Sequence, residues 1–188
     1  EEMTLIYGKA FVCNKEMNLI YVVDTSTDLV LDSIAVGSSP TCIKQDSKSR
    51  LWVLCEGASG DPNQESGLYR IDPKSYGVEQ VFTNSEGKMS RLAVNGDHDT
   101  LYYLGTGAIK GVMRMAIEEQ KLPTSAFIQL NKEVNVYGLG VNPHNGHLFV
   151  SDAIDYLQQS KIFHYDAQGL LLNSANAGVN TSSFLFLK

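Results

Sequence analysis

The residues of this chain that could do chemistry are aromatic, acidic and basic side chains placed at the ends of short apolar runs. Seven of them form the candidate set: Trp52, Glu56, Arg91, Tyr137, Asp152, Asp155 and Tyr156. Aromatic faces combined with a few polar groups are what a small-molecule binding surface needs. We therefore predict a ligand-binding site at these residues, on one rim of the fold. The alternative for Trp52 and Tyr137 is that they only pack between neighbouring sheets.

Catalytic motifs are missing from the sequence, which has no G-x-S-x-G turn, no H-E-x-x-H motif and no glycine-rich phosphate loop. His144 and His147 flank one hairpin turn and could bind a metal, but we favour solvated turn residues. Asp24, Asp72 and Asp166 each follow a strand-like run and are expected to form Asx turns. We therefore predict that the chain is not an enzyme and holds neither a metal nor a cofactor.

Composition narrows the class of partner. The 188 residues carry 15 Lys and Arg against 21 Asp and Glu, a net charge of −6, which argues against nucleic-acid binding through a basic surface. Cys13, Cys42 and Cys55 lie in apolar runs and are predicted to be small buried hydrophobes. No apolar run approaches the ~18 residues of a membrane span. The chain begins Glu1-Glu2-Met3, so any export signal is expected to have been removed.

Short strands must position the candidate residues. Runs rich in Val, Ile, Leu, Tyr and Phe are separated by Gly, Asn, Asp, Ser and Pro, which is the pattern of strands and turns. An aromatic run recurs at residues 51–53, 101–103 and 148–150. Repeats of about 40–50 residues with several short strands are typical of β-propeller blades. The predicted fold class is all-β, a β-propeller. The chain would supply four blades, each a four-stranded antiparallel sheet, in one domain over residues 1–188.

The innermost strand of each blade is predicted at residues 41–45, 91–95, 138–142 and 184–188. The chain would then begin inside a blade, and residues 184–188 would close the ring by pairing with residues 10–13. Three alternatives stay open: a fragment of a larger propeller, a half-ring closed by a second copy as a homodimer, and a self-closed ring of four blades. In propellers, the loops between second and third strands share a rim with the loops between blades, and this rim would gather the candidate residues.

Several stretches resemble a known repeat family. Residues 20–27 and 34–40, a strand, Asp-Thr and then a strand ending in Val-Gly-x-x-Pro, resemble the YVTN/YncE-like propeller repeat. Residues 51–57, 137–143 and the Ser-Asp-Ala-Ile-Asp-Tyr stretch at 151–156 are similar to the carboxy-terminal half of the "surface layer" propeller lipoproteins of gut Bacteroidetes.

This resemblance implies a ring of about seven blades and an exported protein of the cell surface or periplasm, with a lipid anchor upstream. At least one branch of these proteins captures cobalamin and related corrinoids beside an outer-membrane transporter. We therefore expect non-enzymatic capture of a corrinoid or another small ligand, with such a transporter as a partner. The alternative function is a protein-interaction scaffold without a small ligand, and a propeller hydrolase or lactonase is less favoured.

Overall fold

The computed structural model describes residues 2–58, 65–85 and 87–187, and within these residues every regular element is a strand. The strands form four four-stranded antiparallel sheets. The first sheet contains β1 (Met3–Ile6), β2 (Lys9–Asn14), β3 (Leu19–Asp24) and β4 (Val30–Ala35). The second contains β5 (Pro40–Gln45), β6 (Leu51–Cys55), β7 (Ser66–Ile71) and β8 (Val78–Asn84). The third contains β9 (Gly87–Val94), β10 (Thr100–Gly107), β11 (Gly111–Ala116) and β12 (Ile128–Gln129). The fourth contains β13 (Val136–Val141), β14 (Leu148–Asp152), β15 (Gln159–Tyr165) and β16 (Leu171–Val179).

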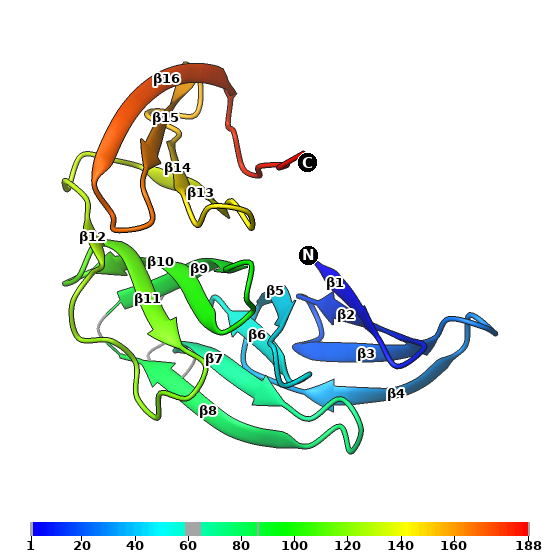
Figure 1. The fold of residues 1–188 in the computed structure, drawn as a ribbon. Coiled ribbons are helices and arrows are strands. Elements are labelled where there is room, and N and C mark those ends of the chain that lie inside the picture. The colour runs from blue at the N-terminus through cyan, green and yellow to red at the C-terminus, as the bar shows by residue number, and fades with distance from the viewer. Residues whose placement is uncertain (1, 59–64, 86, 188) are drawn as a thin grey trace.

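Each sheet is a meander in which the chain runs outward strand by strand and then returns to the centre. Figure 1 shows the four sheets as an arc, with β1, β5, β9 and β13 near the centre and β4, β8 and β16 at the periphery. Both ends of the chain also turn toward the centre (Figure 1). This is the blade arrangement of a β-propeller, and it confirms the predicted fold class.

Apolar packing between neighbouring sheets holds the arc together. β6 is buried at every position because it is covered on both faces. Its alternate residues Leu51, Val53 and Cys55 pack toward the first sheet. Trp52 and Leu54 pack toward the third. This alternation follows from the two-residue period of a strand, and it explains why the inner strands read as continuous apolar runs.

The predicted ring closure is wrong. The innermost strand of the first sheet is β1, which pairs with β2 from Met3 opposite Val12 to Ile6 opposite Lys9. Residues 184–187 form no strand, and Lys188 lies outside the described residues. The chain therefore does not begin inside a blade.

A tight turn explains why β1 takes this place. Tyr7 and Gly8 both adopt positive φ, +52° and +71°, as a two-residue hairpin turn with the twist of the strands requires. Such a local hairpin closes a very short loop, whereas pairing residues 184–188 with β2 would order a much longer one.

No helix in the described ranges is long and apolar enough to cross a membrane.

Candidate functional site

Three inner strands carry a β-bulge at the same rim of the arc. The ladder skips Thr41 where β5 pairs with β6, Arg91 where β9 pairs with β10, and Tyr137 where β13 pairs with β14. A bulge leaves one residue out of the ladder and turns its side chain in a new direction. Thr41 and Arg91 line the same cavity, and Tyr137 is in contact with Arg91.

Arg91 has the most constrained geometry of the three. Its φ is +52°, a left-handed conformation that costs free energy in a bulky residue. Its Nε donates a hydrogen bond to the Tyr137 carbonyl oxygen at 2.6 Å, and its guanidinium carbon lies 5.2 Å from the centre of the Tyr137 ring. Strained residues of this kind concentrate at functional sites, so the geometry marks Arg91 as a candidate.

Tyr156 extends this cluster. Its ring packs edge-on against Tyr137, with 5.7 Å between ring centres, and its hydroxyl donates to Asn135 Oδ1 at 3.3 Å. Tyr156 is 48% exposed and also has a positive φ of +65°. Arg91, Tyr137 and Tyr156 therefore form one contiguous group, which we call the rim group.

Asp152 and Asp155 shape the loop that presents Tyr156. Asp152 Oδ1 accepts hydrogen bonds from the backbone N–H of Asn135 and of Ile154, both at 2.8 Å. Asp155 accepts from the Leu157 and Gln158 backbone and from the Gln158 side chain, at 2.8–3.0 Å. These hydrogen bonds lower the pKa of the Asp155 carboxyl to about 2. The hydrogen bond from the Gln158 side chain is the largest cause. Both carboxylates thus hold the loop in shape.

Asn180 lies against the same loop. Its Nδ2 donates to the Tyr156 carbonyl oxygen at 3.3 Å, and its φ is +56°. Its Oδ1 is buried and has no hydrogen-bond partner among the described residues. An unsatisfied buried acceptor is costly, so this atom is a candidate contact for a bound donor.

Two predicted site residues lie elsewhere. Trp52 sits inside the core with no exposed surface, its Nε1 donating to Asp46 Oδ2 at 2.9 Å and its ring stacked on Phe82 at 5.6 Å. It offers no surface to a ligand. Glu56 follows β6 at the rim, where its N–H donates to the Ser39 carbonyl oxygen at 2.9 Å. Among the described residues, Glu56 makes no contact with the rim group, and residues 59–64 of its loop lie outside the described residues.

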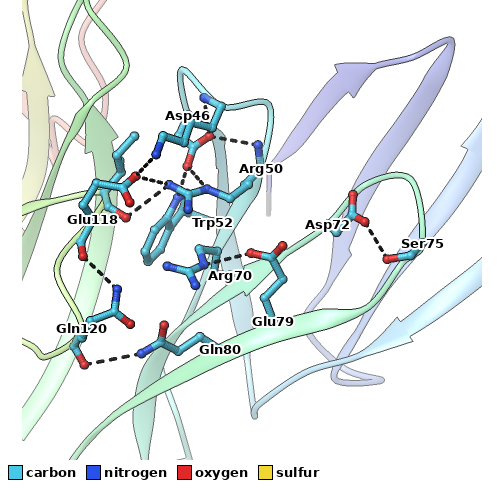
Figure 2. Close-up of polar contacts among 12 residues, drawn as sticks. Asp46, Arg50, Trp52, Arg70, Asp72, Ser75, Glu79, Gln80, Glu118 and Gln120 are labelled. Carbon is cyan, nitrogen blue, oxygen red and sulfur yellow. Dashed lines mark hydrogen bonds and ion pairs between the residues drawn. The ribbon is translucent and has the colours of Figure 1, made fainter.

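Asp46 organises the surroundings of Trp52 (Figure 2). Its buried carboxylate also accepts from Arg50 Nε at 2.7 Å. Arg50 in turn reaches the next sheet, where its Nη2 donates to the Ile117 carbonyl oxygen at 3.2 Å and to Glu118 Oε1 at 3.1 Å. This network is a clamp between the second and third sheets rather than a ligand site.

Below the rim, the inner strands and the residues after β16 surround a cavity of about 560 Å³, which we call the axial channel. Its volume lies within the ~300–1,000 Å³ typical of small-molecule sites. Its wall is formed by residues from the sheets or from the segments that flank them. The charged and bulky apolar lining residues include Glu2, Lys44, Arg91, Leu139, Phe184 and Phe186. Sequence reasoning missed Glu2 and Lys44, because nothing in their local pattern distinguishes them from ordinary surface charges.

The histidines and cysteines are weaker candidates for a functional site. Within the described part of the chain, no cluster of three or more His, Cys, Asp or Glu side chains could hold a metal. His147 Nδ1 lies 2.9 Å from His164 Nε2, so these two histidines form a hydrogen-bonded pair. The three cysteines are buried, as predicted, and they are unpaired; burial raises the thiol pKa of Cys13 and Cys55 to about 12. Such thiols are poor nucleophiles.

Solved structures share this fold at low sequence identity. A quinoprotein alcohol dehydrogenase-like protein from Bacteroides thetaiotaomicron superposes with a TM-score of 0.71 and 14% identity, over 94% of this chain and 45% of that one. A gluconolactonase from Xanthomonas campestris superposes with a TM-score of 0.69 and 19% identity, over 95% and 62%. A dihydro-heme d1 dehydrogenase gives 0.67 and 10%, over 94% and 37%. The chain thus spans less than two thirds of each.

No family model matches the sequence, and no curated protein matches it either. The narrower resemblance to surface-layer lipoproteins therefore stays a prediction. The prediction that the chain is not an enzyme is wrong as an exclusion, because the fold is shared with a dihydro-heme d1 dehydrogenase and a gluconolactonase. At these identities the likeness shows the fold alone and transfers no activity.

Proposed function

We propose that this propeller binds a small molecule at the mouth of the axial channel, against the rim group. The observation that carries the proposal is the coincidence of the cavity of about 560 Å³ with two bulge residues in its wall, Thr41 and Arg91, and a third, Tyr137, in contact with Arg91. A rigid sheet scaffold with re-aimed side chains at its rim is suited to hold a ligand in one orientation.

The chemistry of the rim group supports a ligand with a flat face. Tyr137 and Tyr156 offer aromatic surface and Arg91 offers donors, while Asn180 Oδ1, which lies beside the rim group, offers an acceptor. The resemblance found in the sequence suggests a corrinoid, whose broad ring is edged with amide groups. The corrinoid, the cell-surface location and the transporter partner all stay predictions.

A calorimetric titration tests the site. Cyanocobalamin and a panel of flat aromatic molecules are titrated into the chain and into Tyr137→Ala, Tyr156→Ala and the control Leu157→Ala. Leu157 is 83% exposed in the same loop. For any compound that binds, each tyrosine variant should lose about 1–3 kcal/mol of binding free energy, and the control should bind as the unmodified chain does.

The outcomes separate the alternatives. Binding that neither tyrosine variant weakens would move the site away from the rim group. If no compound binds and none raises the melting temperature, the small-molecule proposal fails and the scaffold function takes its place.

A further inference from the structure

The axial channel already holds one carboxylate. Glu2 Oε2 accepts a hydrogen bond from the Ile43 backbone N–H at 2.9 Å, and Glu2 Oε1 forms an ion pair with Lys44 Nζ. Both donors belong to β5, whose other edge is paired with β6. The open edge of β5 therefore directs a backbone donor and an ammonium group to one point, which is how proteins recognise a carboxylate.

The charges in the channel wall favour an anion. Among the described lining residues, Lys44 and Arg91 are the lysine and arginine, and Glu2 is the acid. This local positive excess occurs in a chain whose net charge is −6. Arg91 uses Nε on the Tyr137 carbonyl oxygen, and the residue belongs to the channel wall. An excess of one sign of charge in a cavity wall favours ligands of the other sign.

The opposite wall is apolar. Leu139 and Val141 of β13 line the channel together with Phe184 and Phe186, which pack against Phe149 at 5.9 and 5.4 Å between ring centres. A molecule in the channel would therefore meet charge on the β5 side and hydrocarbon on the β13 side. Only an amphiphilic ligand satisfies both walls, because a buried charge needs a partner and an apolar wall gains from covering apolar surface.

We propose that the ligand of this site is an organic anion with a flat apolar body, an inference that rests on the function proposed above. Lys44 and the Ile43 N–H bind its anionic group at the place that the Glu2 carboxylate takes in this structure. Arg91 adds attraction at the mouth, and the apolar body lies against Leu139 and Phe184. Glu2 thereby acts as a built-in competitor that the ligand must displace.

Three probes with the same body and different charge test this inference: 2-naphthoate, 2-naphthylmethanol and 2-naphthylmethylamine. Affinities are measured by NMR titration of the full chain, because molecules of this size bind in about the millimolar range. We expect naphthoate to bind about tenfold more tightly than the alcohol, and the ammonium probe to bind more weakly than both.

Variants then assign the difference to named groups. Lys44→Gln should lower the affinity for naphthoate about tenfold, and Glu2→Gln should raise it. Neither variant should change the affinity for the alcohol probe. Lys121→Gln removes the same charge from an exposed residue outside the channel and should have no effect. The gain in Glu2→Gln keeps the test decisive even if Lys44→Gln folds poorly.

The two proposals fail in different ways. Equal affinities for the three probes, or a Glu2→Gln variant that binds naphthoate no better, would overturn the anion inference and leave the site standing. If none of the probes shifts the amide signals of the β5, β9 and β13 residues that line the channel, the small-molecule site itself is wrong.

Discussion

Asp46 and Asp155 show how differently two carboxylates serve the same fold. The Asp46 carboxylate has no exposed surface and receives hydrogen bonds from Trp52, Arg50 and the Lys48 backbone N–H. The Asp155 carboxylate lies in solvent and organises one loop. Loss of a buried, paired charge is costly because its partners stay buried and unsatisfied, whereas water replaces an exposed one.

We expect Asp46→Ala to lower the free energy of unfolding by about 3 kcal/mol, because it leaves the Trp52 Nε1–H and the Arg50 guanidinium without their acceptor. Urea denaturation followed by tryptophan fluorescence measures this. Asp97→Ala is the matched control, since Asp97 is exposed in the corresponding turn of the next sheet. Similar midpoints for the two variants would show that the clamp between the sheets adds no stability.

The Asp155 carboxyl should titrate with a midpoint near pH 2, below its ordinary value of 3.8. Because the folded pKa is lowered, the contribution of Asp155 is complete above pH 4 and is lost as the pH falls through about 2. NMR detection of the carboxyl carbon gives the midpoint directly. Gln158→Ala removes the foremost cause and should raise the midpoint toward 3.8, and an unchanged midpoint contradicts this loop geometry.

At the scale of elements, the residues after β16 return to the centre and pack on the fourth sheet without joining a ladder. Phe184 and Phe186 contact Phe149, whereas Leu185 and Leu187 point away and are 84% and 81% exposed. This alternation is that of an extended chain with one buried face. The segment is therefore held by these aromatic contacts and by hydrogen bonds of the Thr181 backbone with the Ser151 and Ser160 hydroxyls, without a strand ladder.

Phe184→Ser combined with Phe186→Ser should lower the free energy of unfolding by about 2 kcal/mol, the value for losing two half-buried aromatic contacts. Leu185→Ser with Leu187→Ser changes the same number of apolar residues and should have almost no effect, because those side chains are already in solvent. Thermal melting by circular dichroism compares the two. If the leucine pair matters more, residues 184–187 lie with the opposite face inward.

At the scale of the whole molecule, the first sheet is covered on one face only. Phe11, Ile20 and Val22 pack toward the second sheet, whereas Leu5 and Val30 lie on the opposite face and are 62% and 61% exposed. The inner sheets of the arc have both faces covered by neighbours. An exposed apolar sheet face of this kind favours association.

We expect the chain to associate at rising concentration, and Leu5→Lys with Val30→Lys to reduce this while the circular dichroism spectrum stays that of β-structure. Sedimentation velocity over a concentration series measures the association, and Leu157→Lys, which changes an exposed loop leucine, is the control. A ring closed by two copies predicts a discrete dimer by native mass spectrometry, and a monomer at all concentrations excludes association through this face.

The sequence by itself determined the class of fold, the strand repeats of the second, third and fourth sheets, and the local turn chemistry. The Asx turns predicted at Asp24, Asp72 and Asp166 are present, each Oδ1 accepting the N–H two residues later. These features follow from short-range rules: strand alternation, repeat length and the hydrogen bonds of an acid to its own turn. Arg91, Tyr137, Asp152, Asp155 and Tyr156 could be named because they occupy loop and strand-end positions of the repeat.

Only the tertiary structure decided which of those residues meet and what surrounds them. It buried Trp52 between two sheets, placed β1 where the sequence predicts residues 184–188, and brought Glu2 beside Lys44 in the channel wall. Each of these outcomes depends on contacts between residues far apart in sequence, or on competition between two segments for one sheet edge. Such choices are made by packing and loop closure over the whole chain, and no local pattern carries them.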